Sequence, residues 1–310
     1  MFDPRGRGFL SATGGTEGLK CPVLVVEPMS SLHRAVVRIT CPDRPGIVSD
    51  VSGLLFRLGL NIHHADQHLD AEANLFFQRI EFPVPEGWER VRTELTKGLD
   101  ALGMRHSLRV LSERLRVGVL ISKHPHCGLD ILDRHRTGEI QCEVPVVISN
   151  HPDLGPEITR RGYTFVHEPI AGNKVEQEQR ILARLAEERV DLVILARYMQ
   201  ILTGNFVAAY ANRIINIHHS FLPAFAGAEP YRQAFRKGVK LVGATSHYVT
   251  EQLDEGPIIA QNVTRVSHRD TVADMERKGR DLERVVLAEA VRCHLEDRII
   301  AYGHKTVVFE

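Results

Sequence analysis

The chain has 310 residues, of which 43% are hydrophobic, so it is long enough to fold as two domains with a core each. Lysine plus arginine and aspartate plus glutamate number 39 each, which leaves no net charge and argues against a general attraction to nucleic acid. No apolar run approaches the roughly 18 residues that a membrane-spanning helix needs.

Residues 1–31 are predicted to be a flexible extension. They are rich in glycine around Gly14 and Gly15, and the apolar patch from Val23 to Val26 is too brief for a secretory signal. A transit peptide stays open as an alternative, because the segment has few acidic residues. The cysteines of the whole chain are odd in number and include no C-x-x-C pair, which favours a cytoplasmic protein over a disulfide framework. They are Cys21, Cys41, Cys127, Cys142 and Cys293.

Residues 32–112 are predicted to form a small α+β domain. Apolar strand-like runs, helical spacing and turn residues alternate along this segment. The predicted order is β-α-β-β-α-β, in the ranges 33–39, 48–58, 61–69, 74–82, 86–102 and 107–111. Such a unit folds as one sheet packed against helices.

Two short motifs in this domain resemble the ACT domain, a ferredoxin-like module that commonly binds amino acids at a subunit interface. One is the loop Asp43-Arg44-Pro45-Gly46-Ile47-Val48, which opens a helix, and the other is Gly59-Leu60-Asn61-Ile62. The resemblance implies a homo-oligomer and a regulatory amino-acid site. Its residues would be Asp43, Gly46, Asn61 and Ile62. A role in subunit assembly alone is the alternative.

Residues 113–310 are predicted to form a larger α/β domain with a doubly wound, mostly parallel sheet. Continuous β-branched runs alternate with helical segments, as in strands that are buried on both faces. The predicted strands cover 117–122, 144–148, 163–166, 190–195, 213–217, 241–249 and 258–266, and a short pair follows at 299–302 and 306–309. The predicted helices cover 129–136, 157–161, 175–188 and 272–298.

The last predicted helix is expected to pack across the sheet. Its apolar positions are Met275, Val285, Leu287, Val291 and Leu295. The loop after the first strand, Ser122 to Gly128, matches neither the dinucleotide fingerprint nor a P-loop, so bound NAD or ATP is not expected. Lys123 in this loop could meet an anionic group or simply be solvated.

The segment from Arg213 to Pro223 carries the most informative pattern. Side chains alternate across a strand, so Asn216 and His218 share one face at the strand's end, where ligands of open α/β sheets collect. An amide and an imidazole there can both donate to an oxyanion, and Asp254 in the turn of Leu253-Asp254-Glu255-Gly256-Pro257 could pair with the imidazole.

Two other readings compete with this one. A histidine after an apolar strand is as often a satisfied core or surface residue, and Asp-Glu-Gly-Pro is ordinary turn chemistry. His218, His219, His247 and Asp254 could alternatively bind a metal. The spacing argues against a metal, because His218 and His219 point to opposite sides of a strand and no H-x-x-x-H pattern occurs in this half of the chain.

From about Arg116 onward the chain resembles the folate-dependent formyltransferase fold. The matching motifs are Ile215-Asn216-Ile217-His218 with Leu222-Pro223, Leu253 to Ile259, and Leu195 to Leu202. The resemblance implies that Asn216, His218 and Asp254 are catalytic. The substrate-binding residues that it implies are Arg197, Met199, Gln200, Ile201, Leu202, His247 and Gly256.

An ACT-like domain joined to this fold is the arrangement of the formyltetrahydrofolate deformylases. This resemblance implies a hydrolase that converts 10-formyltetrahydrofolate to formate and tetrahydrofolate, supplying formate for purine synthesis and balancing one-carbon pools. No cofactor, metal, nucleic acid or membrane is expected. The alternatives are a transferase with an amine acceptor on the same fold, and a non-catalytic amino-acid sensor.

Overall fold

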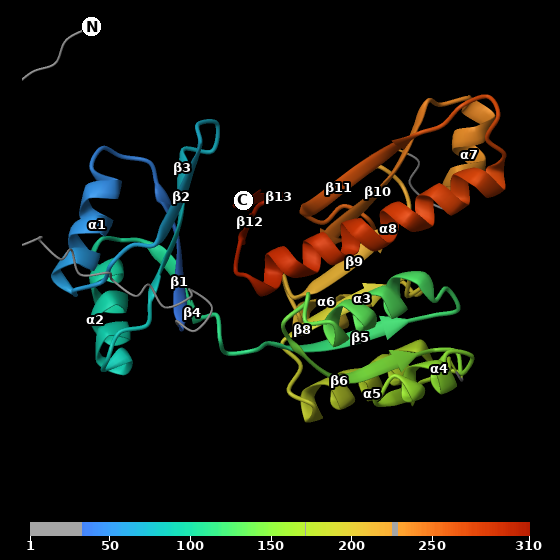
Figure 1. Cartoon of the computed structure of the whole chain (residues 1–310), viewed down its shortest axis with the longest axis horizontal. Coiled ribbons are helices and arrows are strands. Elements are labelled where there is room, and N and C mark those ends of the chain that lie inside the picture. The colour runs from blue at the N-terminus through green and yellow to red at the C-terminus, as the bar shows by residue number, and fades with distance from the viewer. Residues whose placement is uncertain (1–32, 171, 225–228) are drawn as a thin grey trace, which may run out of the picture. The chain divides into compact units, whose positions relative to one another are not determined.

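The structure is a computed structural model that describes residues 33–170, 172–224 and 229–310 (Figure 1). The predicted extension, with Gly14, Gly15 and Cys21, lies outside the described residues. Among the residues that are described, no helix is both long enough and apolar enough to cross a bilayer.

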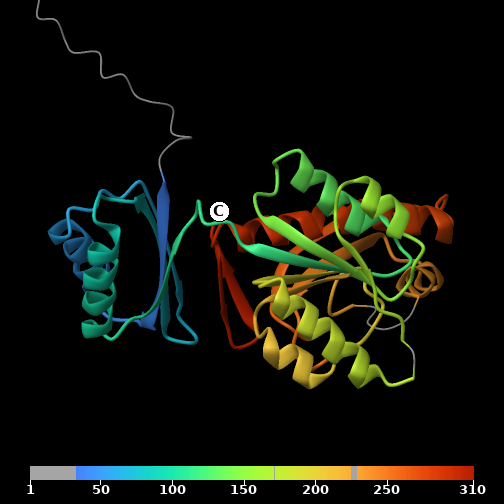
Figure 2. The same cartoon turned by 90° about the horizontal axis from the view of Figure 1, so that it is seen from below.

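The first domain has the predicted β-α-β-β-α-β order. Its elements are β1 Arg34–Pro42, α1 Ile47–Arg57, β2 His64–Asp70, β3 Leu75–Pro83, α2 Trp88–Ala101 and β4 Arg105–Val110. The sheet has the order β2-β3-β1-β4, and its pairs are all antiparallel. Both helices cover one face of this sheet (Figures 1 and 2). Val51 and Leu55 of α1 and Leu95 and Leu99 of α2 are buried in the shared core, as the helical spacing requires.

The second domain is built on a seven-stranded sheet of order β11-β10-β9-β8-β5-β6-β7. Its strands are β5 Arg116–Ile121, β6 Glu143–Ser149, β7 Phe165–His167, β8 Leu192–Ala196, β9 Ile214–His218, β10 Leu241–Tyr248 and β11 Ile258–Arg265. Strands β5 to β9 pair in parallel, whereas β10 and β11 pair antiparallel. The predicted mostly parallel, doubly wound α/β fold is therefore confirmed.

Helices cover both faces of this sheet (Figure 2). They are α3 His126–Arg136, α4 Gly155–Arg160, α5 Lys174–Glu187, α6 Gly204–Ala209, α7 Pro230–Lys237 and α8 Val272–Leu295, and the hairpin of β12 Ile299–Tyr302 and β13 Lys305–Val308 follows. Side chains of α3, α4 and α8 pack in one core with Val119 and Ile121. Those of α5 and α6 pack with Leu120 in a second core on the opposite face. Successive side chains of β5 therefore point alternately into the two cores on opposite faces of the sheet.

Helix α8 packs across the sheet as predicted, but one of its expected core positions is wrong. Met275, Leu287, Val291 and Leu295 are buried, whereas Val285 is 50% exposed. Residues that are two positions apart in a helix point about 200° away from each other, so Val285 cannot face the same side as Leu287. The sequence interpretation also missed α6 and α7, which are only 6 and 8 residues long.

Candidate active site

The strand pair β9 and β10 brings together most of the polar residues of interest. In their antiparallel register Asn216 lies opposite His247, and the amide Nδ2 of Asn216 is 3.3 Å from His247 Nε2. His218 ends β9, and its Nδ1 lies 3.2 Å from the Oδ1 atom of Asp254, in the turn between β10 and β11. The three residues predicted to be catalytic therefore converge at the carboxyl end of β9.

The two nitrogens of the His218 ring have different surroundings. Nδ1 faces the carboxylate of Asp254, whereas Nε2 is buried and has no hydrogen-bond partner among the described residues. His218 as a whole is 6% exposed. A buried ring nitrogen without a partner is costly unless a ligand supplies one. Since His218 also lines the cavity at this site, Nε2 is the atom available to a substrate.

The carboxyl group of Asp254 is held in its ionised form. Burial raises the pKa of Asp254, but the hydrogen bond and charge of His218, with the nearby His247, outweigh this effect and lower the pKa below its ordinary value of 3.8. At neutral pH the site therefore contains a carboxylate next to an imidazole. Such a carboxylate favours the protonated ring and can accept a proton.

His247 fixes the orientation of the Asn216 amide. Burial lowers the pKa of His247, so the ring is neutral near pH 7. Its Nδ1 lies 2.8 Å from the carbonyl oxygen of Tyr248 and donates to it, which leaves Nε2 as an acceptor. The Asn216 amide then donates one N–H to His247 and keeps its second N–H for a ligand.

A cavity of about 430 Å³ opens beside these residues. It is lined by Asn216, His218, His247 and Asp254, and also by the predicted substrate-binding residues Arg197, Met199, Gln200, Ile201 and Leu202. Around it, Met199 is 53% exposed, Ile201 60% and Leu253 58%. Large apolar side chains left exposed around a cavity are typical of a site for a flat, partly apolar ligand.

The loop after β8 that forms one side of this cavity is anchored at two of its backbone amides. The Met199 N–H donates to the Ser122 hydroxyl at 3.1 Å, and that hydroxyl donates to Asn150 Oδ1 at 2.6 Å. The Thr203 N–H donates to the buried carboxylate of Glu178 at 3.1 Å. The loop is therefore shaped before any ligand arrives, which lowers the entropic cost of binding.

Gly256 is not among the residues that line this cavity, and its contact with substrate stays a prediction. A Cβ atom at this position would lie 1.7 Å from the carbonyl oxygen of Tyr248, which shows why the turn needs glycine. Sequence reasoning also missed His219, Glu229 and residues 249–253, which do line the cavity. Residues 249–253 precede Asp254 directly, so the position of Asp254 was the available signal for them.

Gly256→Ala is expected to destabilise the protein by about 1–3 kcal/mol or more, because the added methyl group forces the Asp254 turn away from β10. Thermal unfolding would show a lower Tm, and turnover would fall with it. Gly53→Ala on α1 is the matched control. Its Cβ would meet only the end of the Arg57 side chain at 3.5 Å, so its Tm should stay the same or rise. An unchanged Tm for Gly256→Ala would contradict the close packing.

The predicted regulatory residues lie at the surface of the first domain. Asp43 and Gly46 precede α1, with Gly46 as its N-cap at φ 88°, and Asn61 and Ile62 precede β2. All four are exposed. Exposed N–H groups at the start of α1 are suited to an anionic group, but the regulatory role of these residues stays a prediction.

A metal site formed by His218, His219, His247 and Asp254 is not supported by this geometry. No three of these four residues bring one ligand atom each to within 4.8 Å of one another. In the described parts of the chain, the group that does meet this distance is His126, Cys127 and Glu283.

Comparisons with known proteins agree with this architecture. A model of the formyl transferase family matches residues 115–291, and a model of the ACT domain matches residues 35–82. The formyltetrahydrofolate deformylase of Synechocystis sp. is 50% identical over 280 residues, which cover 89% of this chain and 98% of that protein.

Solved structures give the same result. The crystal structure of a formyltetrahydrofolate deformylase from Pseudomonas syringae pv. tomato has a TM-score of 0.88 at 41% identity, covering 91% of this chain and 96% of that one. Glycinamide ribonucleotide transformylase 1 from Symbiobacterium toebii has a TM-score of 0.62 at 38% identity, and covers 66% of this chain and 98% of its own. With its ACT domain and its formyl transferase domain, the chain therefore belongs to the formyltetrahydrofolate deformylase family.

Proposed function

We propose that the protein hydrolyses 10-formyltetrahydrofolate to formate and tetrahydrofolate. The observation that carries this proposal is the His218 ring, whose Nδ1 meets the Asp254 carboxylate while its Nε2 has no partner beside the cavity. No serine or cysteine lines that cavity, so water is the nucleophile that fits the described site. The close relatives named formyltetrahydrofolate deformylase support the same reaction.

In this mechanism water attacks the formyl carbon, and the carbonyl oxygen becomes an oxyanion. The free N–H of Asn216 and the protonated Nε2 of His218 donate to this oxygen, each worth about a hundredfold to a thousandfold in rate. Asp254 orders the water and accepts its proton, which adds roughly a hundredfold to ten-thousandfold. The bond from carbon to N10 then breaks, N10 receives a proton from the His218 and Asp254 pair, and formate leaves.

Formate release from 10-formyltetrahydrofolate by the purified protein, without an added amine, tests the proposal. A same-fold transferase is the second candidate, and the likeness to a glycinamide ribonucleotide transformylase favours it. A transferase would turn over only slowly without an amine acceptor, and once one is supplied it would pass the formyl group to the amine instead of releasing formate. Formate release at an undiminished rate without acceptor therefore separates the two. A non-catalytic amino-acid sensor would release none.

We also propose that the site works without a metal or any other cofactor. Treatment with EDTA and 1,10-phenanthroline, followed by gel filtration, is expected to leave kcat unchanged, because the Asn216, His218 and Asp254 set supplies both the oxyanion donors and the base. Formate release measured before and after treatment checks this. Loss of activity that added zinc restores would favour a metallohydrolase instead.

The ACT domain supports a second proposal, that an amino acid binds at the loop of Asp43 and Gly46 and regulates a homo-oligomer. Activity measured with added small amino acids, together with the mass of the protein in solution, tests this. We further propose that the enzyme works in the cytoplasm and supplies formate for purine synthesis. The four cysteines among the described residues are free and buried, as suits a reducing compartment.

A further inference from the structure

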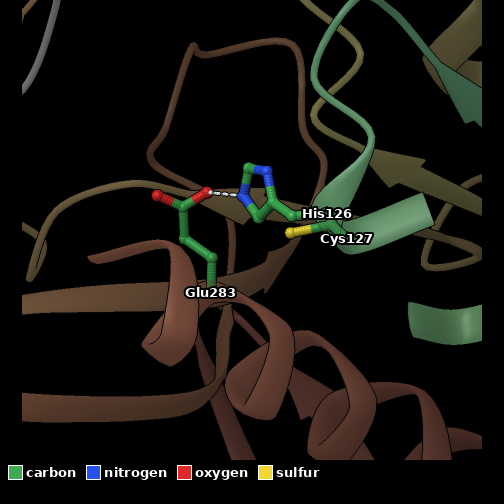
Figure 3. A group of neighbouring side chains, drawn as sticks. All are labelled: His126, Cys127 and Glu283. Carbon is green, nitrogen blue, oxygen red and sulfur yellow. Dashed lines mark hydrogen bonds and ion pairs between the residues drawn. The ribbon is translucent and has the colours of Figure 1, made fainter. Parts of the chain in front are cut away.

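The further inference concerns Glu283, a buried carboxylate on the helix that crosses the sheet. Its side chain is 2% exposed, and three different elements contact it. His126 Nε2 at the start of α3 lies 2.8 Å from Oε2, Arg197 Nε after β8 lies 3.4 Å from the same oxygen, and the Tyr231 hydroxyl of α7 donates to Oε1 at 3.0 Å. Figure 3 shows the His126 ring directed at the carboxylate.

This cluster is better suited to a hydrogen-bonded network than to a metal ion. A cation at His126, Cys127 and Glu283 would lie beside the Arg197 guanidinium, which already pairs with the same carboxylate oxygen as His126. Burial and the charge of Glu283 also raise the pKa of the Cys127 thiol far above its ordinary value, so this thiol is protonated at neutral pH. Burial raises the pKa of Glu283, but the His126 hydrogen bond and the Arg197 charge outweigh it and keep the carboxylate ionised.

Arg197 has a strained backbone at the wall of the substrate cavity. Its φ is 61°, in the left-handed region that a residue with a Cβ enters at a cost of about 1–2 kcal/mol. Such strain persists only where the surroundings hold it, and it is concentrated at functional sites. Arg197 lines both the 430 Å³ cavity and a second, polar cavity of about 260 Å³ on the side of His126 and Glu283. Its side chain is 10% exposed, so its charge requires a partner.

We propose that Glu283 is a positioning residue for the hydrolysis. Its carboxylate holds the Arg197 guanidinium at the wall between the two cavities, and through Arg197 it sets the loop of residues 198–202 around the folate. Glu283 does not contact the site of attack at Asn216, His218 and Asp254. Its loss is therefore expected to affect substrate binding more than the chemical step.

Glu283→Gln tests this inference, which rests on the proposed hydrolysis. The variant keeps the shape of the side chain and removes its charge. KM is expected to rise about tenfold, the change that about 1.4 kcal/mol of lost uniform binding produces, while kcat stays within about threefold. Glu289→Gln, in a half-exposed pair with Arg292 on the same helix, is the matched control and should behave as the wild type.

A double-mutant cycle with Arg197→Met separates positioning from packing. If Glu283 acts through Arg197, the double variant should have the same KM as Arg197→Met alone, because the loss of Glu283 changes nothing further once Arg197 is absent. The double variant also keeps the test informative if Glu283→Gln alone fails to fold. Additive effects, or a lower Tm with unchanged KM, would overturn the inference.

Two further measurements keep the outcomes distinct. Calorimetric titration with tetrahydrofolate should show a Kd about tenfold weaker for Glu283→Gln, and this readout does not depend on turnover. If the wild type releases no formate, the proposed function fails while the binding result still tests Glu283. When the wild type is titrated with zinc, we expect no binding that depends on Glu283, which means no binding that is lost in Glu283→Gln. Such binding would overturn the positioning role in favour of a metal site.

Discussion

Replacing His218 with alanine is expected to lower kcat by about a thousandfold or more, while tetrahydrofolate binds within about threefold of its wild-type affinity. The ring is one of the two proposed oxyanion donors and is part of the pair that returns a proton to N10. Its Nε2 has no other partner among the described residues, so its removal breaks no protein contact on that side. Formate release and calorimetric titration measure the two quantities separately.

The control for this variant is His268→Ala, because His268 is exposed in the loop before α8 and does not line the cavity. Its turnover should equal that of the wild type. A kcat for His218→Ala within about threefold of the wild type would remove His218 from the chemistry. A large loss of folate affinity would instead indicate that the ring serves binding.

The local pattern of the sequence was sufficient for one part of this site. The two-residue period of β9 predicts that Asn216 and His218 share a face, and the polar residues after an apolar run predict a strand end. The pairing with Asp254 depends on the turn between β10 and β11 and on the register of β9 with β10, which no local pattern encodes. The turn carboxylate suggested this pairing, and the resemblance to a known fold supported it.

Other features had weaker signals in the sequence. Helix α7 has only 8 residues, which is too short for a clear period. Glu283 falls on the buried stripe that also contains Gly279, Val286 and Ala290, so a charged residue at an apolar position of α8 was the available signal. This signal was hidden because the helix carries many other charged residues. Gly256 was assigned to the substrate because its motif was recognised, whereas its close approach to Tyr248 is visible only in the structure.

Asp254→Asn is expected to lower kcat by about a hundredfold to ten-thousandfold with little change in folate affinity. The amide keeps the shape of the side chain and can still contact His218 Nδ1, but it neither accepts the proton of the attacking water nor favours the protonated ring. Glu255→Gln, at the exposed neighbouring acid of the same turn, is the control and should keep full activity. A turnover of Asp254→Asn near that of the wild type would mean that Asp254 is not the base of the reaction.

Asp254→Asn is also expected to change how the free energy of unfolding depends on pH. Because His218 and His247 keep the pKa of Asp254 below its ordinary 3.8 against the effect of burial, the folded state gains stability from the carboxylate above the unfolded pKa. This gain is lost as the pH falls through the lower pKa of the folded state. The difference in free energy of unfolding between wild type and Asp254→Asn should therefore shrink as the pH falls from about 5 to below about 3. Urea unfolding across this range measures it, and a difference that does not depend on pH would mean that Asp254 is not held ionised by its histidines.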